Sequence, residues 1–332
     1  MQLGYFFGKG VLRRDRDSFR LLIAALPLIA QLLVNAIPFV YDLFLLGHFS
    51  TTALASMQIS ATIFFSLFSV LTVFSTGSLL RTILIGSFAA GLSFMGIDAL
   101  LSLFPMATPS VKEAAKEYLT CVIPALPIYL VAATLAQRCS ISIGCKSMCL
   151  HIACSTLLIF GFFGLPSMGV RGAAIASIAG AILQVVLLRK NGLACKGKEL
   201  SVSSFIERAL YYGSFLLLTV MVGNLGDVAM ATQQALIALG ILCFVCTNAL
   251  CQTCSQGMAM CLMSALAAIL WFGATGCMRL CSSDPEVIAL GVSCFSLFAI
   301  IQPLSACAVL LSDTRNAKVA FLSGCFVRGA MA

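Results

Sequence analysis

The stretch LLIAALPLIAQLLVNAIPFVYDLFLLG, residues 21–47, decides the fold of this chain. Asp42 is its single charged residue, and the run is long enough to cross a hydrocarbon core that takes roughly 20 helical residues. An ionisable side chain inside a membrane helix is costly, so it usually faces a bundle interior or a water-filled cavity. The stretch therefore predicts a membrane-spanning helix whose acid belongs to an ion or substrate pathway.

The polar residues of this stretch fall on one face of the predicted helix. Gln31, Asn35, Pro38 and Asp42 lie close to one line at 3.6 residues per turn. Pro27 and Pro38 each lack a backbone N–H and leave a carbonyl without its helical partner, so we expect a bent helix. These features predict a moving helix with one polar face.

The composition extends the membrane assignment to the whole chain. Of the 332 residues, 61% are hydrophobic and only 10% are charged, whereas soluble domains carry about 25% charged residues. A polytopic, all-α membrane protein is therefore expected. The apolar runs predict ten helices, at 20–47, 53–76, 80–104, 117–138, 147–164, 170–189, 207–226, 229–254, 257–279 and 286–312.

The basic residues indicate an orientation rather than a nucleic-acid surface. The net charge is +8, but the lysines and arginines lie in short segments between apolar runs. Of these 20 residues, 16 fall on one side of the predicted membrane and four on the other. The positive-inside rule then places the N-terminus in the cytoplasm. We expect a lipid bilayer and no nucleic acid as surroundings of this chain.

The 16 cysteines do not indicate a disulfide or metal framework. Most lie inside apolar runs, where cysteine behaves as a small hydrophobic residue. Two CxxC pairs occur, Cys243/Cys246 and Cys251/Cys254, without an accompanying histidine or a framing loop. The sequence therefore predicts no metal and no cofactor, and the absence of paired acids or a nucleophile triad in the spans argues against an enzyme.

The chain contains an internal repeat, in which the numbers of matching residues differ by a constant 176. It relates Gly47 to Gly223, Gln58 to Gln234, Pro109 to Pro285, and Pro127 to Pro303. Because six predicted helices separate the copies, both have the same orientation, as in parallel-repeat transporters. The expected domains are a six-helix lobe at 1–189, a cytoplasmic linker at 190–204, and a second lobe at 205–332. The second lobe is expected to be incomplete, with four helices and a partial fifth.

With the repeat in view, the chain resembles the multidrug and toxic compound extrusion (MATE) transporters, nearest the branch that includes the DNA-damage-inducible protein F group. The matching segments are ALP at 25–27, YDLFLLG at 41–47, ALA at 53–55, LLIFG at 157–161, GVRGAAIAS at 169–177, and residues 226–234. The resemblance implies two helix bundles around a central inter-lobe cavity in a bacterial cytoplasmic membrane. It also implies export of organic cations or amphiphiles in exchange for H⁺ or Na⁺.

Several site residues follow from the resemblance. Asp42 falls on the family's first-helix acid, Pro27 on its first-helix proline, and Ser177 on a sixth-helix position that usually holds threonine. The fifth helix departs from the pattern, because His151 and Ser155 stand where an asparagine and an aspartate are usual. The other candidates for the cavity are Gln31, Asn35, Tyr41 and Gln58.

The predicted mechanism is an exchange at one carboxylate. Asp42 binds a cationic substrate when ionised and a proton otherwise, so that each occupant excludes the other. His151 is either a proton relay or a hydrogen-bonding residue between helices. Two other functions stay open: a shortened, transport-inactive membrane protein, and a flippase for lipid-linked precursors or polysaccharides, for which arginines would be expected to line the cavity.

Overall fold

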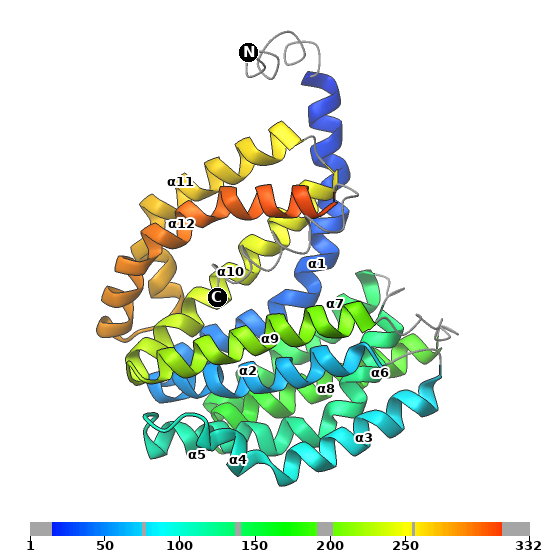
Figure 1. Ribbon diagram of the computed structural model, residues 1–332, viewed down its shortest axis with the longest axis vertical. Helices are drawn as coiled ribbons and strands as arrows, with labels where there is room; N and C mark the ends of the chain where they lie inside the picture. Colours follow the sequence, from blue (N-terminus) through cyan, green and yellow to red (C-terminus); the bar gives the residue numbers. More distant parts are fainter. Residues whose placement is uncertain (1–14, 75–77, 137–140, 191–201, 254–255, 314–332) are drawn as a thin grey trace.

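The computed structural model describes residues 15–74, 78–136, 141–190, 202–253 and 256–313, and these ranges are predominantly helical (Figure 1). The elements in chain order are α1 (Asp15–Phe49), α2 (Thr51–Thr72), α3 (Leu79–Met95), α4 (Ile97–Ser102), α5 (Pro109–Val122), the 3-10 turn η2 (Ile123–Ala125), α6 (Leu126–Ala136), α7 (Ile141–Phe160), the 3-10 turn η3 (Phe162–Gly164), α8 (Val170–Lys190), α9 (Val202–Gly223), α10 (Asp227–Thr253), α11 (Gln256–Cys281) and α12 (Pro285–Asp313).

Eight helical segments in the described part of the chain are long and apolar enough to cross a membrane. The chain is therefore a multi-pass integral membrane protein. The sequence predicted ten spans, and the two that differ are α3, which is a shorter apolar helix, and α12, which bends by 44° between Pro285–Phe295 and Leu297–Leu304. The predicted helix at 80–104 ends early because Gly96 separates α3 from α4.

The fourth predicted helix begins earlier than expected and is not continuous. Pro109 occupies the first turn of α5, where a missing N–H costs little. The element then passes through η2, which contains Pro124, into α6. A proline removes one helical hydrogen bond and disfavours a straight continuation, so this span consists of two helices joined by a tight turn.

The helix starts repeat with the offset found in the sequence. α2 begins at Thr51 and α10 at Asp227, while α5 begins at Pro109 and α12 at Pro285. In both pairs the residue numbers differ by 176, as they do between the sequence copies. The repeated residues therefore occupy equivalent places at the starts of equivalent helices.

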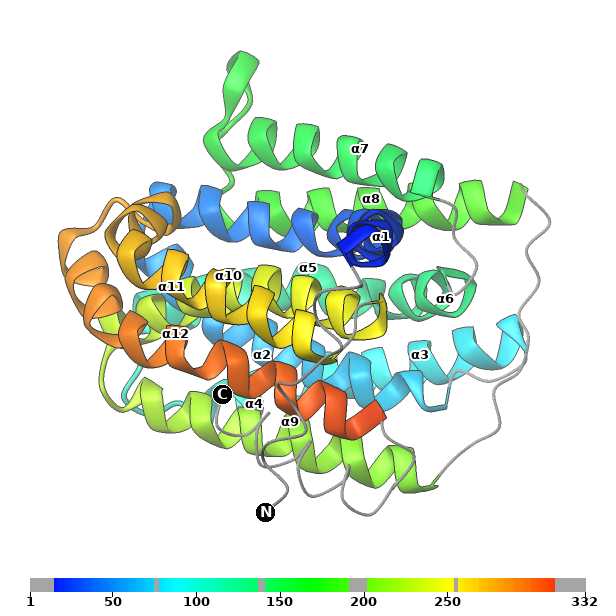
Figure 2. The same cartoon turned by 90° about the horizontal axis from the view of Figure 1, so that it is seen from above.

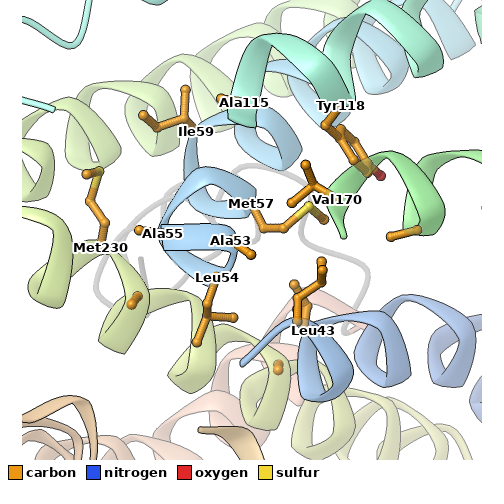
Figure 3. Close-up of a cluster of buried hydrophobic side chains, with 14 of the residues drawn as sticks. Leu43, Ala53, Leu54, Ala55, Met57, Ile59, Ala115, Tyr118, Val170 and Met230 are labelled. Atoms are coloured by element: carbon orange, nitrogen blue, oxygen red, sulfur yellow. The ribbon is translucent and has the colours of Figure 1, made fainter. Parts of the chain in front are cut away.

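α2 is the central helix of the core. Figure 3 shows its small and branched side chains, including Ala53, Leu54 and Ala55, among residues from α1, α5, α8 and α10. Alanines allow neighbouring helices to approach α2 closely, and all three side chains are buried. The arrangement joins residues of both sequence copies in one continuous apolar core.

The helices of the two copies pack against each other as well as within each copy. α7 packs on α8, and α11 packs on α12, within the first and second copies respectively. α1 and α2 of the first copy also contact α10, and α2 contacts α9. Most of the predicted linker at 190–204 and the predicted partial fifth helix of the second lobe, after residue 313, lie outside the described residues.

α1 changes direction along its length. Pro27 and Pro38 lie inside this 35-residue helix. Figure 2 views its first part nearly end-on while its second part runs across the picture, and Figure 1 shows the same turn from the side. Prolines are a usual cause of sharp helix bends. The second part of α1 places Asp42 against α7.

Candidate functional site

Asp42 lies buried between α1 and α7, and both of its carboxylate oxygens are engaged. Its side chain belongs to a residue that is only 2% exposed. Ser155 donates its hydroxyl to Oδ1 over 2.5 Å, and His151 Nε2 lies 2.9 Å from Oδ2. An ionised carboxylate only accepts hydrogen bonds, so the His151 tautomer that suits it carries the proton on Nε2.

His151 and Ser155 come to the acid because they lie one helical turn apart on α7. Residues four positions apart share a helix face, and both side chains are buried. In the sequence these two residues were the departure from the family pattern. The structure shows that they nevertheless provide the two hydrogen-bonding partners of the acid.

A cavity of about 220 Å³ opens beside this cluster. Its walls come from α1, α2 and α5 to α8, so all of its lining residues belong to the first sequence copy, whereas the resemblance implied a central cavity between two lobes. Its polar lining includes Asp42 and His151. The lining residues are Val34, Asn35, Pro38, Phe39, Asp42, Phe64, Phe65, Phe68, Tyr118, Tyr129, Ala132, Gly144, Ser147, Met148, His151, Ser177, Gly180, Ala181 and Gln184.

Aromatic rings form the cavity wall contributed by α1, α2 and α6. The rings of Phe64 and Phe68 are stacked at 6.0 Å, with an interplanar angle of 10°. Phe39 meets Phe65 edge to face at 5.0 Å, and Phe64 meets Tyr129 at 5.2 Å. Aromatic faces attract cations. The cavity therefore combines one buried acid with a wall suited to a cation that carries apolar groups.

Two further hydroxyl pairs bind the helices around the acid together. Tyr129 and Ser177 are 2.7 Å apart between α6 and α8, and Tyr41 and Thr156 are 2.8 Å apart between α1 and α7. Ser177 and Tyr129 line the cavity, whereas Tyr41 is turned toward α7 and does not. The first-named pair therefore joins α6 to α8, and the Tyr41–Thr156 pair joins the two helices that carry Asp42 and His151.

Glycines of α7 and α8 allow the close approach that the site needs. A methyl group added at Gly180 would lie 3.2 Å from His151 Cβ and 3.4 Å from its Nδ1. One added at Gly144 would lie 2.6 Å from the side chain of Val34 on α1. α7 therefore packs closely against α1 at Gly144 and against α8 at Gly180, because neither glycine has a side chain.

The structure brings together only some of the predicted site residues. Asn35 lines the cavity and donates to the Gln31 carbonyl oxygen over 3.1 Å, but the Gln31 side chain is not part of the lining. Gln58 lies elsewhere, because its Nε2 donates to the Thr219 hydroxyl over 3.0 Å between α2 and α9. Gln58 therefore joins helices of the two sequence copies and is not part of this cavity. Pro38 lines the cavity and Pro27 does not.

The sequence did not identify the aromatic wall. Phe64 and Phe68 lie four residues apart on α2, which places them on one helix face. That spacing was a usable signal, although aromatic residues at helical spacing also form ordinary apolar cores. Tyr118 and Tyr129 were missed for the same reason. The described residues contain no group of three or more potential ligands able to hold a metal.

The comparisons with known proteins concern both sequence and fold. No family model matches the chain. It is 25% identical over 209 residues to the probable multidrug resistance protein NorM of Thermotoga maritima, in a match that covers 52% of this chain and 45% of that protein. The match thus spans just under half the length of this curated relative.

Solved structures match over nearly the whole chain. The eukaryotic MATE transporter AtDTX14 superposes with a TM-score of 0.58 at 19% identity, covering 95% of this chain and 93% of that one. An inward-facing multidrug resistance MATE transporter of the MOP superfamily gives 0.55 at 12% identity, covering 91% of each chain. The MATE multidrug transporter DinF-BH, solved in complex with a ligand, gives 0.56 at 15% identity, with 92% and 85% covered.

These structural matches establish the fold, and the sequence match supplies a relationship to a curated multidrug resistance protein. Both agree with the motifs at 41–47, 157–161 and 169–177 and with the internal repeat. The chain therefore has the fold of the MATE transporters, and about half of it is similar in sequence to a probable multidrug resistance protein.

Proposed function

We propose that this protein is a secondary active transporter that exports organic cations or drug-like amphiphiles in exchange for protons. The observation that carries the proposal is the buried Asp42 carboxylate, held by His151 and Ser155 at the edge of an aromatic cavity in a membrane-spanning lobe. In this proposal the membrane is a bacterial cytoplasmic membrane and the N-terminus lies inside. The branch of the family is that of the DNA-damage-inducible protein F group.

Asp42 serves as the shared site for proton and cargo. When ionised, it attracts a cation in the cavity and accepts hydrogen bonds from both neighbours. When protonated, it becomes a hydrogen-bond donor, so that either the Ser155 hydroxyl turns or His151 Nε2 becomes an acceptor. Protonation thus removes the charge that holds the cargo and rearranges its hydrogen bonds. The two occupants exclude each other, which is the requirement for exchange.

The groups around the acid favour a proton over Na⁺ as the coupling ion. Na⁺, like other hard cations, is bound by several oxygen ligands. Here one carboxylate oxygen is taken by a serine hydroxyl and the other faces an imidazole nitrogen, which is a poor ligand for such an ion. Imidazole is instead the side chain whose charge changes most readily near neutral pH. Proton exchange is therefore the better fit to this site.

The energy source follows from the charge balance. If one monovalent cation leaves for each proton that enters, no net charge crosses the membrane. Each unit of pH difference then supplies about 1.4 kcal/mol, enough for roughly a tenfold cargo gradient. The membrane potential, about 2.3 kcal/mol per charge per 100 mV, adds nothing. Export of a monovalent cation should follow the pH difference alone.

A flippase function finds less support in the cavity. A pyrophosphate-linked or acidic polysaccharide cargo would need arginines or lysines to bind it. Among the described residues that line the cavity, none is a lysine or an arginine, while one is an aspartate. The cavity is suited to a cationic cargo rather than an anionic one.

Efflux of a fluorescent cation from cells or inverted vesicles tests the proposal. We expect Asp42→Asn to reduce pH-driven efflux at least about tenfold, because the amide can neither ionise nor carry the proton. Asp98→Asn is the matched control, since Asp98 is an exposed acid of the same lobe that pairs with Lys116 at 2.5 Å. Equal efflux by native protein and Asp42→Asn, at several pH differences, would refute the assignment of Asp42.

A further inference from the structure

Two hydrogen bonds join the lobes where α2 and α12, and α5 and α10, begin. The Thr51 hydroxyl donates to Asp284 Oδ2 over 2.5 Å, and the Thr108 hydroxyl donates to Asp227 Oδ2 over 2.6 Å. Both threonines belong to the first sequence copy and both aspartates to the second. Each bond therefore connects one lobe to the other.

The two bonds are equivalents of one another under the internal repeat. The offset of the repeat carries Thr51 of the first copy onto Asp227 of the second, and Thr108 onto Asp284. A two-fold relation between two bodies makes every contact appear twice with the partners exchanged. The Thr51–Asp284 and Thr108–Asp227 pairs meet this condition. The lobe interface at this face is therefore reciprocal.

Two equivalent glycines, Gly47 and Gly223, lie in close contacts beside the two hydrogen bonds. A methyl group added at Gly47 would lie 1.8 Å from the carbonyl oxygen of Cys281, so α1 and α11 touch there through main-chain atoms. Ser283 N also donates to the Gly47 carbonyl oxygen over 3.4 Å. Gly223, the equivalent of Gly47, packs at 3.4 Å on the ring of Phe104, which precedes α5.

Asp284 is prepared for its role by its own helix. Its Oδ1 accepts the backbone N–H of Glu286 over 2.9 Å and so caps the start of α12, which leaves Oδ2 for Thr51. The hydrogen bond from Thr51 is the main cause that holds the pKa of Asp284 below its ordinary value, with the backbone N–H groups adding to it. The carboxylate is thus ionised at neutral pH, and hydrogen bonds to ionised acceptors are stronger than neutral ones.

The contact at the opposite end of α2 is not reciprocal. Arg208 of α9 donates to the Thr72 hydroxyl and, over 3.1 Å, to the Ser69 carbonyl oxygen. The residue equivalent to Arg208 in the first copy is Leu32, which has no such group. The reciprocal pair of bonds is therefore specific to the face where α2, α5, α10 and α12 begin.

We propose that the Thr51–Asp284 and Thr108–Asp227 hydrogen bonds form a reciprocal latch that holds the two lobes closed at this face. Opening the face separates both pairs together, because the same lobe movement displaces each of them. The latch lies at the end of α1, and Asp42 precedes Gly47 by five residues, about 7.5 Å along the helix. A change at Asp42 that moves α1 would act directly on the latch, but the latch itself does not require Asp42 to couple to protons.

The test uses hydrogen–deuterium exchange on the purified full-length protein in lipid nanodiscs. Thr51→Asp places two carboxylates opposite each other, and we expect exchange in the peptides covering 47–54 and 281–288 to rise at least about fivefold, because like charges in contact repel. Thr52→Val, a change at the neighbouring threonine outside the latch, is the matched control. A peptide from the start of α7 reports whether this part of the chain stays folded, because it lies at the opposite end of that helix from Phe160, which contacts Phe49 beside the latch.

The exchanged pair distinguishes a latch from a general loss of structure. Thr51→Asp combined with Asp284→Thr reverses donor and acceptor, and each new residue already occurs at the equivalent position of the other copy, as Asp227 and Thr108. We expect this double variant to restore native exchange. If Thr51→Asp exchanges no faster than Thr52→Val, or if the double variant stays as fast as Thr51→Asp, the latch is refuted, whatever the efflux measurements show for Asp42.

Discussion

Asp42 in the first sequence copy and Leu218 in the second occupy equivalent positions of α1 and α9 under the internal repeat, but only Asp42 forms a polar site. Asp42 is buried with two hydrogen-bonding partners, while Leu218 is partly exposed and apolar. The helix starts and the inter-lobe hydrogen bonds nevertheless repeat between the copies.

The packing features of the helices are therefore repeated in both copies, whereas the buried acid is present in one copy. Each lobe needs capped helix starts and small residues at close contacts in order to pack, so these features are present in both copies. A buried carboxylate is tolerated only where neighbouring helices supply donors. In the described residues of the first copy, α7 supplies the donors, whereas the second copy has an uncharged leucine at the equivalent of Asp42.

The largest effect is expected from removing the histidine that supports the acid. His151→Phe leaves Asp42 Oδ2 buried without its partner, and breaking a buried pair in this way costs about 3 kcal/mol. His48→Phe is the matched control, because His48 is exposed and bonds only the Phe44 carbonyl oxygen of its own helix. Chemical denaturation in detergent at pH 7.5 measures both. Equal stability of the two variants would show that His151 does not support the acid.

A second comparison uses the equivalent glycines of the lobe interface. Gly47→Ala forces a methyl group to 1.8 Å from a backbone oxygen, whereas the nearest atom at Gly223 is 3.4 Å away, an ordinary contact. We expect Gly47→Ala to lower the free energy of unfolding by about 1 to 3 kcal/mol, the range for overpacking. Gly223→Ala should change it by less than about 0.5 kcal/mol. Similar losses for both variants would contradict the described asymmetry.

The equivalent glutamines offer a smaller contrast. Gln58 Oε1 and Gln234 Nε2 are both buried with no partner among the described residues. The two glutamines differ because Gln58 Nε2 donates to Thr219, whereas the residue equivalent to Thr219 is the apolar Leu43. Gln58→Leu should therefore cost about 1 kcal/mol of stability. Gln234→Leu should be neutral or stabilising, because it removes an unpaired donor. Thermal unfolding of both variants measures these changes, and we expect Gln58→Leu to unfold at a lower temperature than Gln234→Leu. The opposite result would contradict the prediction.

The smallest effect is expected from pH at the latch. The pKa of Asp284 is lowered in the folded protein, chiefly by the Thr51 hydrogen bond. Its stabilising contribution is therefore complete above the ordinary pKa of about 3.9 and is lost as the pH falls through the lower, folded value. The stability difference between native protein and Thr51→Val should stay constant from pH 8 to 5. A decline within that range would contradict the assignment.

Most of the helices could be predicted from the sequence, because the length of an apolar run and the positions of prolines and glycines are local signals. The acid was identifiable since a lone charge in an apolar run is costly wherever the helix lies. The position of Gln58 was not, because helical periodicity gives the face of a side chain but not which neighbour lies against it. The same limit hid the aromatic wall of Phe64 and Phe68.

The partners of Asp42 could be named only in part. His151 and Ser155 were recognised as substitutions in a familiar pattern, but their hydrogen bonds depend on the seating of α7 against α1 and α8. That seating rests on close contacts at Gly144 and Gly180, which become visible only when three helices are packed together. The break at Gly96 shortened a span that looked continuous in composition, and the turn at Pro124 divided another span into two helices.

Proton release on cargo binding tests the central claim most directly. A fluorescent organic cation is added to the purified protein in weakly buffered detergent solution, and a pH indicator records the protons set free per cation bound. The account predicts release that approaches about one proton per cation where Asp42 starts protonated, and none from Asp42→Asn. Tight cation binding without proton release at any pH, or equal release from Asp42→Asn, would contradict it.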